Sequence, residues 1–113
     1  MEGRPKNTSV ALSSTDLTTV YTCPPNFTAI IRDVFLTNVD GSAAVDATLK
    51  YTDTSASATF SLLSTTSISA DSYLRLENAH IILEEGDILK VQAGAANDLE
   101  VSVFVEEFHR PQG

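Results

Sequence analysis

Turn-forming residues recur at short intervals along this sequence, and their spacing limits what the chain can fold into. Clusters of Gly, Pro, Asn, Asp and Ser, the residues that favour tight turns, stand at 23–26, 38–42, 53–57, 69–72, 77–79, 84–87 and 94–98. None of the segments between them carries the i, i+3, i+4, i+7 apolar stripe that a helix of three turns would need. The sequence therefore predicts an all-β protein.

The segments between the turns have the composition and the alternation of β-strands. They are rich in Thr, Val, Ile, Leu, Phe and Tyr, which suit a pleated, half-buried surface. We expect about eight strands, at 17–22, 27–37, 44–52, 58–64, 73–77, 79–84, 87–93 and 99–108. Val45, Ala47 and Leu49, for example, fall on one face of their strand. Short strands at this spacing indicate a sandwich or a barrel, and we predict a single antiparallel β-sandwich of jelly-roll-like type.

The length and the ends of the chain suggest one folded body with loose termini. A chain of 113 residues is long enough for one domain and too short for two. Residues 1–16 are polar, contain Gly3 and Pro5, and show no clear period, so we expect a flexible N-terminal arm there. The sandwich domain is expected at 17–108, with a C-terminal tail at 109–113.

The charge and hydropathy of the chain argue against several classes of partner. The formal net charge is −8, from 15 acids and 7 bases, so nucleic-acid phosphates would repel the chain. No window is apolar for the length of a membrane span. The N-terminal segment lacks the apolar core of a signal peptide. We therefore expect no nucleic-acid partner, no membrane association, and synthesis in a host cytoplasm.

The acids at 84–87 allow two interpretations. Glu84, Glu85 and Asp87 could form a chemical site, or they could mark a turn between two strands. Gly86 accepts positive φ at no steric cost, and Asp87 can bond to its own turn backbone. The residue spacing of a calcium-binding loop is absent. We favour the turn, and a weak calcium site at these three acids stays open.

Catalytic signals are missing from the sequence. Neither His80 nor His109 lies near a nucleophile motif or a second metal-ligand histidine. Cys23 is the only cysteine, and with no electropositive surroundings it is expected to be a small buried apolar residue. We expect no enzymatic activity and no cofactor or structural metal.

Two predicted strands carry apolar side chains on the face that should meet water. On 27–37, Ile31 and Phe35 lie opposite the face that carries Ile30, Val34 and Leu36. On 99–108, Phe104 shares the polar face, and Phe108 follows at its end. We expect Ile31, Phe35, Phe104 and Phe108 to contact a second copy of the chain. A strand fully covered within one sandwich is the alternative.

A carbohydrate-binding surface is a second possibility. Sugars usually stack on aromatic rings, and this chain has three tyrosines and no tryptophan. Tyr73, which follows the turn at 69–72, is the best candidate for an exposed ring that contacts a glycan. A half-buried tyrosine with only its hydroxyl in water is the simpler interpretation of the same residue.

Three stretches of the sequence resemble a known class of proteins. They are LTTVYTCPPNFTAIIRDVFLTNVDGSAA, DTSASATFSLLSTTSISADSYLRLE and ILEEGDILKVQAGAANDLEVSVFVEEF, within residues 17–108. In their order and turn patterns they resemble small β-sandwich virion structural proteins of tailed bacteriophages. Such proteins serve as capsid decoration (cement) proteins or as head- or tail-fibre domains. The resemblance brings no active-site residues with it.

The resemblance implies a role on the outside of a virion. The short chain favours a decoration protein over a complete fibre, and a threefold position on a shell favours a homotrimer. Its partners would then be its own copies and the major capsid protein of the virion. Arg4 and Lys6, in the expected arm, would contact a neighbouring capsid subunit. A fibre domain that binds a host surface glycan is the alternative.

Overall fold

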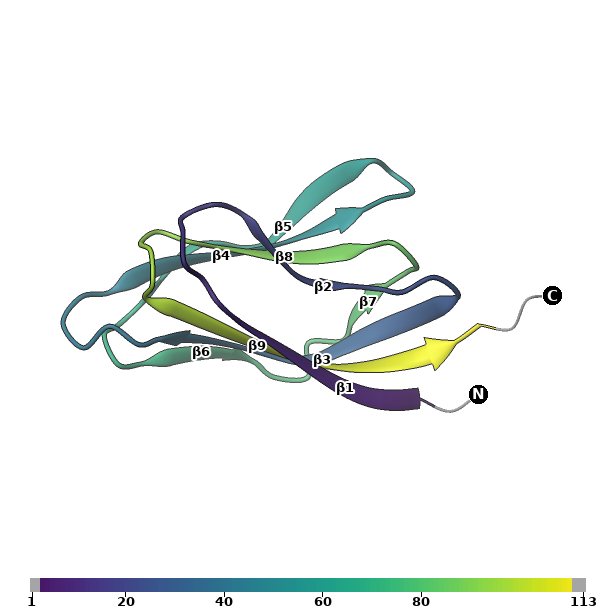
Figure 1. Cartoon of the computed structure of the whole chain (residues 1–113), viewed down its shortest axis with the longest axis horizontal. Coiled ribbons are helices and arrows are strands. Elements are labelled where there is room, and N and C mark those ends of the chain that lie inside the picture. Colours follow the sequence, from purple (N-terminus) through teal and green to yellow (C-terminus); the bar gives the residue numbers. More distant parts are fainter. Residues whose placement is uncertain (1–2, 111–113) are drawn as a thin grey trace.

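The computed structural model describes residues 3–110, which form nine β-strands (Figure 1). The strands are β1 Gly3–Ala11, β2 Thr18–Thr22, β3 Phe27–Asn38, β4 Val45–Asp53, β5 Ala58–Ile68, β6 Tyr73–Leu76, β7 Ile81–Leu83, β8 Ile88–Ala93 and β9 Leu99–His109. The eight expected strands correspond to β2–β9, and β1 is additional. Within the described residues no helix is long and apolar enough to cross a membrane.

The strands form two antiparallel sheets that pack face to face (Figure 1). The larger sheet has the order β1-β9-β3-β6, and β7 also pairs with β3. The smaller sheet has the order β2-β8-β4-β5. The predicted fold class, a single antiparallel β-sandwich, is confirmed.

The core lies between the sheets and follows the alternation of the strands. Val45, Ala47 and Leu49 of β4 all point inward and are at most 3% exposed, as the sequence predicted. Every second residue of β8 and of β9 up to Val105 is buried in the same way. Each fully buried Val or Leu contributes about 1.5–3 kcal/mol relative to an exposed one. The two inner faces therefore hold the sandwich together.

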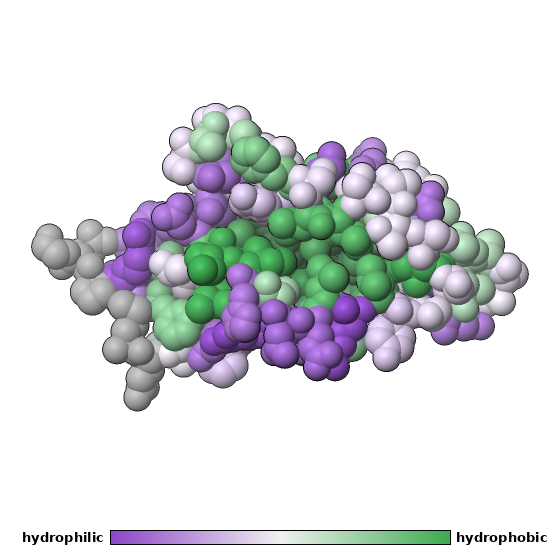
Figure 2. Space-filling view, turned by 180° about the vertical axis from the view of Figure 1, so that it is seen from behind, coloured by the Kyte–Doolittle hydropathy of each residue, from purple (hydrophilic) through white to green (hydrophobic). Residues whose placement is uncertain are grey.

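One edge of the sandwich carries hydrophobic side chains that pack against this core and are only partly buried. The edge lies between β5 of the smaller sheet and β6 and β7 of the larger one, on the side away from the viewer in Figure 1. Seen from behind, hydrophobic side chains are visible along the middle of the molecule, between the two sheets (Figure 2). The strands β6 and β7 have only 4 and 3 residues, so they cover less of the core than the long strands do.

A β-bulge at Arg32 divides β3 into two parts with opposite phase. Ile31 pairs with Val105 and Asp33 with Phe104, so β3 has one residue more than β9 at this point. The extra residue changes which face the following side chains occupy. Ile31 therefore points into the core and is fully buried, whereas Phe35 points outward. The expectation that Ile31 shares an outer face with Phe35 is wrong, because strict alternation does not continue through a bulge.

The N-terminal residues form a strand where a flexible arm was expected. Residues 3–11 pair with β9 over their whole length, from Gly3 opposite Phe108 to Ala11 opposite Glu100. β1 is the edge strand of the larger sheet, and its polar composition suits an edge that is largely in water. The expectation is therefore wrong for 3–11, and residues 1–2 lie outside the described part. Of the expected tail, His109 ends β9, and residues 111–113 are not described.

Candidate interaction surface on the larger sheet

Three aromatic side chains gather on the outer face of the larger sheet. Phe35 comes from β3, Phe104 from β9 and Tyr73 from β6, and the register of these strands makes them neighbours. The ring centroids of Phe35 and Phe104 are 5.8 Å apart at an interplanar angle of 82°, an edge-to-face contact. The Phe35 and Tyr73 centroids are 6.1 Å apart. We call Phe35, Tyr73 and Phe104 the aromatic patch.

The aromatic patch is exposed to solvent and has a charged border. Phe104 is 41% exposed and Tyr73 is 61% exposed, while Phe35 lies half-buried between them. The Arg75 guanidinium lies 5.1 Å from the centre of the Phe35 ring and bonds to Asp33 at 2.9 Å. This hydrogen bond holds the pKa of Asp33 below its usual value. Apolar side chains with a polar border are typical of surfaces that bind another protein or a ligand.

A shallow recess adjoins the aromatic patch. It has a volume of about 330 Å³ and lies beside Phe104, between β1 and the β9–β3 pair. Pro5 and Asn7 line one side, and Arg32 and Glu106 line the other. Arg32 and Glu106 are joined by an ion pair of 2.6 Å. The outer face of this sheet is therefore uneven, with projecting rings beside a hollow.

The structure brings together only some of the residues predicted from the sequence. Phe35 and Phe104 are in contact, and Tyr73, predicted separately as a glycan contact, lies in the same patch. Phe108 is half-buried opposite Thr28, away from the patch along β9. Arg75, two residues after Tyr73 on the same face of β6, was not predicted from the sequence.

Arg4 and Lys6 point between the sheets and toward their own chain. The Nε of Arg4 donates to Oε1 of Glu107 at 2.7 Å, and the Nζ of Lys6 lies 3.9 Å from Oε2. The hydroxyl of Tyr21 donates to Oε2 of Glu107 at 2.5 Å. Glu107 is fully buried. Both bases thus pair with Glu107 while their side chains stay more than half exposed, so their expected role as capsid contacts stays a prediction.

The environment of Glu107 changes the acidity of its neighbours. Burial alone would raise the pKa of Glu107, but the hydrogen bonds from Tyr21 and Arg4 and the charge of Lys6 outweigh it, so the pKa is lowered. Burial, together with the bond to Glu107, raises the pKa of Tyr21. Burial also raises the pKa of the Cys23 thiol to about 11. Cys23 is buried as expected, and its thiol stays protonated at neutral pH.

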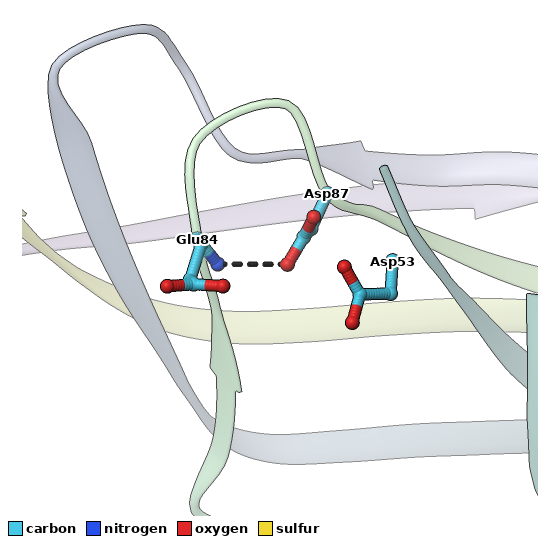
Figure 3. Close-up of side chains that lie close together, drawn as sticks. All are labelled: Asp53, Glu84 and Asp87. Carbon is cyan, nitrogen blue, oxygen red and sulfur yellow. Dashed lines mark hydrogen bonds between the residues drawn. The ribbon is translucent and has the colours of Figure 1, made fainter. Parts of the chain in front are cut away.

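The acidic turn at 84–87 is organised by Asp87 (Figure 3). One oxygen of the buried Asp87 carboxylate accepts hydrogen bonds from the backbone N–H and the hydroxyl of Thr54, both at 3.1 Å. The other accepts the Glu84 N–H at 2.9 Å. Gly86 has a φ of +84°, as a tight turn requires. Asp87 thus joins this turn to the β4–β5 hairpin, which supports the interpretation as a turn.

The carboxylates near this turn differ from the set expected as a weak calcium site. Asp53, Glu84 and Asp87 have oxygens within 4.8 Å of one another (Figure 3). Glu85 is not in this group, and its carboxylate pairs with Arg110. Asp53 accepts bonds from the backbone and hydroxyl of Ser55. The Asp53 and Asp87 carboxylates are therefore already bonded to the backbone of their own turns.

The Asp87→Asn variant is expected to lower the free energy of unfolding by about 1–3 kcal/mol. Thr54 and Glu84 donate to different oxygens of Asp87, and an amide keeps an acceptor at only one of these two positions. Urea denaturation measures the change, with Glu84→Gln as a control that keeps the Glu84 N–H and should shift stability by less than about 0.5 kcal/mol. A stabilised Asp87→Asn variant would instead mean that repulsion between the carboxylates dominates at this turn.

Comparisons with known proteins place the fold and leave the family open. No protein-family model and no curated protein sequence matches the chain. Among solved structures, the core of Drosophila NLP has a TM-score of 0.57 and 9% identity, over 95% of this chain and 99% of that one. That structure is described for pentamer formation and histone binding.

Two further solved structures are similar over nearly the whole chain. A protein of the Bacillus endospore appendages, which form disulfide-linked pili, has a TM-score of 0.54 and 10% identity, over 98% of this chain and 93% of that one. Eiger TNF from S. frugiperda has a TM-score of 0.52 and 12% identity, over 100% of this chain and 97% of that one. At these identities the likeness shows the fold alone, a jelly-roll-like sandwich.

Capsid proteins are also among the structural matches. A pentameric capsid protein from metagenomic phage sequences matches 93% of this chain, with a TM-score of 0.36 and 17% identity. This chain covers 62% of that protein. A TM-score at this level carries no argument about the role of the chain.

Proposed function

We propose that this chain is a structural, non-enzymatic protein whose activity is self-association, and that it serves as a capsid decoration protein of a phage virion. The observation that supports it best is the aromatic patch. Phe35, Tyr73 and Phe104 form one cluster of rings in contact on the outer face of the larger sheet. A second copy of the chain that covers this patch would remove the rings from water, a gain of about 25 cal/mol per Å² of apolar surface.

The composition of the outer face supports a protein partner over a charged polymer. The patch is bordered by the Arg75–Asp33 and Arg32–Glu106 ion pairs, in which each base is matched by an acid. Such paired charges can form the polar rim of an interface around an apolar centre. With a net charge of −8, the rest of the surface would keep assembled particles apart in solution.

The virion role rests on the resemblance in sequence to small structural proteins of tailed phages. A homotrimer, with the major capsid protein as second partner, fits a threefold position on a shell. The bases Arg4 and Lys6 pair within the chain, so in this proposal the exposed body of the sandwich, and not an arm, contacts the shell. Many copies would each add interface area and oppose the pressure of the packed genome.

Light scattering and co-sedimentation test the two parts of the proposal separately. Self-association predicts a mass of about three chains, or a multiple of three, in multi-angle light scattering at micromolar concentration. Decoration predicts that the protein sediments with phage capsids in large copy number and raises the temperature at which they rupture. A monomer at every concentration would contradict the first part, and a trimer that ignores capsids would contradict only the second.

The exposure of Tyr73 favours a second function, the binding of a host surface glycan by a fibre domain. Its ring is 61% exposed beside Phe35, and sugar faces stack on such rings. The Tyr73→Ala variant is expected to lose glycan-array signals that the wild-type chain gives. Tyr51 is a half-buried residue of β4, so Tyr51→Ala should keep these signals once they are corrected for the amount of folded protein. An array without any signal for the wild-type chain would rule this function out.

A further inference from the structure

The strand β5 is a long edge strand without a charge or a proline, although two register shifts interrupt its pairing with β4. It is the last strand of the smaller sheet, and its other side pairs with no strand of the described chain. Its sequence, ATFSLLSTTSI, contains no charged residue and no proline. Edge strands of soluble proteins usually carry Lys or Pro, or are very short, because their free N–H and C=O groups can pair with another chain.

The other edges of the two sheets are charged or short. β1 carries Arg4, Pro5 and Lys6. β2 is 5 residues long and contains a register shift. β6 and β7 have 4 and 3 residues. Only β5, with 11 residues, combines length with an uncharged sequence.

The apolar opening of the sandwich lies directly beside this edge. Leu62 of β5 faces Leu76 of β6 and Ile81 of β7 across a cleft of about 380 Å³, which Arg75, Glu77 and Ala79 also line. Near its start, β5 also carries Phe60, which is 47% exposed and packs on Tyr51 of β4. Figure 1 shows the β4–β5 hairpin rising away from the opposite sheet at this end. A strand added beside β5 would therefore both satisfy the free backbone groups and cover the opening that Figure 2 shows.

We infer that β5 pairs with β5 of a second copy in an antiparallel fashion about a twofold axis, separately from the aromatic patch. The regular part of the strand is Ala58–Ser61, opposite Lys50–Asp53, since the register shifts lie beyond it. An identical strand brings apolar side chains, Phe60 and Leu62, to the opening, and the main-chain bonds of strand addition supply affinity.

The distribution of charge favours contact between two copies at β5 over contact at their other surfaces. Two copies with a net charge of −8 each repel one another over most of their surfaces. At β5 two identical strands meet with no like charges opposite each other, whereas two β1 edges would bring Arg4 and Lys6 of both copies together. A twofold axis also makes the contact self-complementary, because both copies contribute the same strand to the interface.

Cysteine scanning in the Phe35→Ser/Phe104→Ser background tests the pairing without the aromatic patch. The single variants Thr59→Cys, Phe60→Cys, Ser61→Cys and Leu62→Cys are oxidised at micromolar concentration. We expect disulfide-linked dimers at one or two adjacent positions, because antiparallel identical strands bring only residues next to the axis within disulfide distance of their own copy. The buried Cys23 does not interfere. Equal cross-linking at all positions, or at Asn7→Cys on β1, would overturn the inference.

A charge placed on the edge provides a second test. Leu62→Lys in the same background is expected to raise the dimer dissociation constant about tenfold or more in sedimentation equilibrium, because a charged side chain on an edge strand opposes pairing with another strand. Asn7→Lys makes the same change on β1 and should leave the constant unaltered. If the Phe35→Ser/Phe104→Ser chain is monomeric and no cysteine variant cross-links, the inference is wrong, whatever the fate of the proposed function.

Discussion

The Phe35→Ser/Phe104→Ser variant is expected to lose the self-association that the aromatic patch supports. Truncating a hot-spot aromatic residue of an interface costs about 2 kcal/mol or more, so two such changes should weaken that contact roughly 700-fold. The loss should appear as a lower molar mass in light scattering over a dilution series. Phe104 is 41% exposed and Phe35 half-buried on the outer face, so thermal unfolding should show that the variant still folds.

Ile82→Ser is the matched control for this prediction. Ile82 is 62% exposed on the outer face of the same sheet, where it pairs with Ile30 on the other side of the Arg32 bulge from Phe35. Its replacement removes a similar apolar side chain outside the aromatic patch and should leave the molar mass unchanged. An unchanged mass for the double phenylalanine variant, or an equal loss for Ile82→Ser, would show that the patch is not the interface.

The Glu107→Ala variant is expected to lower the free energy of unfolding by about 2–4 kcal/mol. The change leaves the buried hydroxyl of Tyr21 without its acceptor, and removing one partner of a buried ion pair is strongly destabilising. Arg4 is partly exposed, so its guanidinium can turn to water. The loss of stability should therefore stay below the largest values for the removal of one partner of a buried ion pair. Glu106→Ala, which removes the outward-facing acid next to it in sequence, should cost less than about 1 kcal/mol.

The Glu107 carboxylate should also make the stability of the fold depend on pH. The folded pKa of Glu107 is lowered, whereas a glutamate in the unfolded chain titrates at about 4.3. Its contribution is therefore complete above about pH 4.3 and is lost as the pH falls through the folded pKa. Urea denaturation between pH 7 and pH 2 should show a smaller loss of stability for Glu107→Gln than for the wild-type chain. Parallel curves for the two proteins would mean that Glu107 is already protonated in the fold.

The strands that the sequence predicted correctly are those whose alternation is supported by burial. Val45, Ala47 and Leu49 point inward because a β-strand turns successive side chains to opposite faces, and only one face of β4 meets the core. The positions of the turns follow from equally local causes, such as the positive φ of Gly86. Fold class and strand positions could therefore be predicted from neighbours in the sequence.

The features that could not be predicted from the sequence depend on contacts between residues far apart in the chain. β1 is polar, so nothing local distinguishes it from a loose arm, and it becomes a strand because β9 offers a free edge. The ion pair of Arg4 with the buried Glu107 joins residues 103 positions apart. The aromatic patch likewise needs three strands in register, although each of its rings could be named from its own strand.

The bulge in β3 has a consequence for how this chain can change in length. Ile31 opposite Val105 and Asp33 opposite Phe104 are already consecutive pairs of one ladder, and Arg32 is the residue in excess. Excision of that one position would let both halves of the strand keep their partners and their orientation. A deletion elsewhere in β3 would turn the buried side chains of part of the strand toward solvent and the exposed ones toward the core. Arg32, in the middle of the longest strand, is thus the residue of β3 whose deletion should disturb the sheet least.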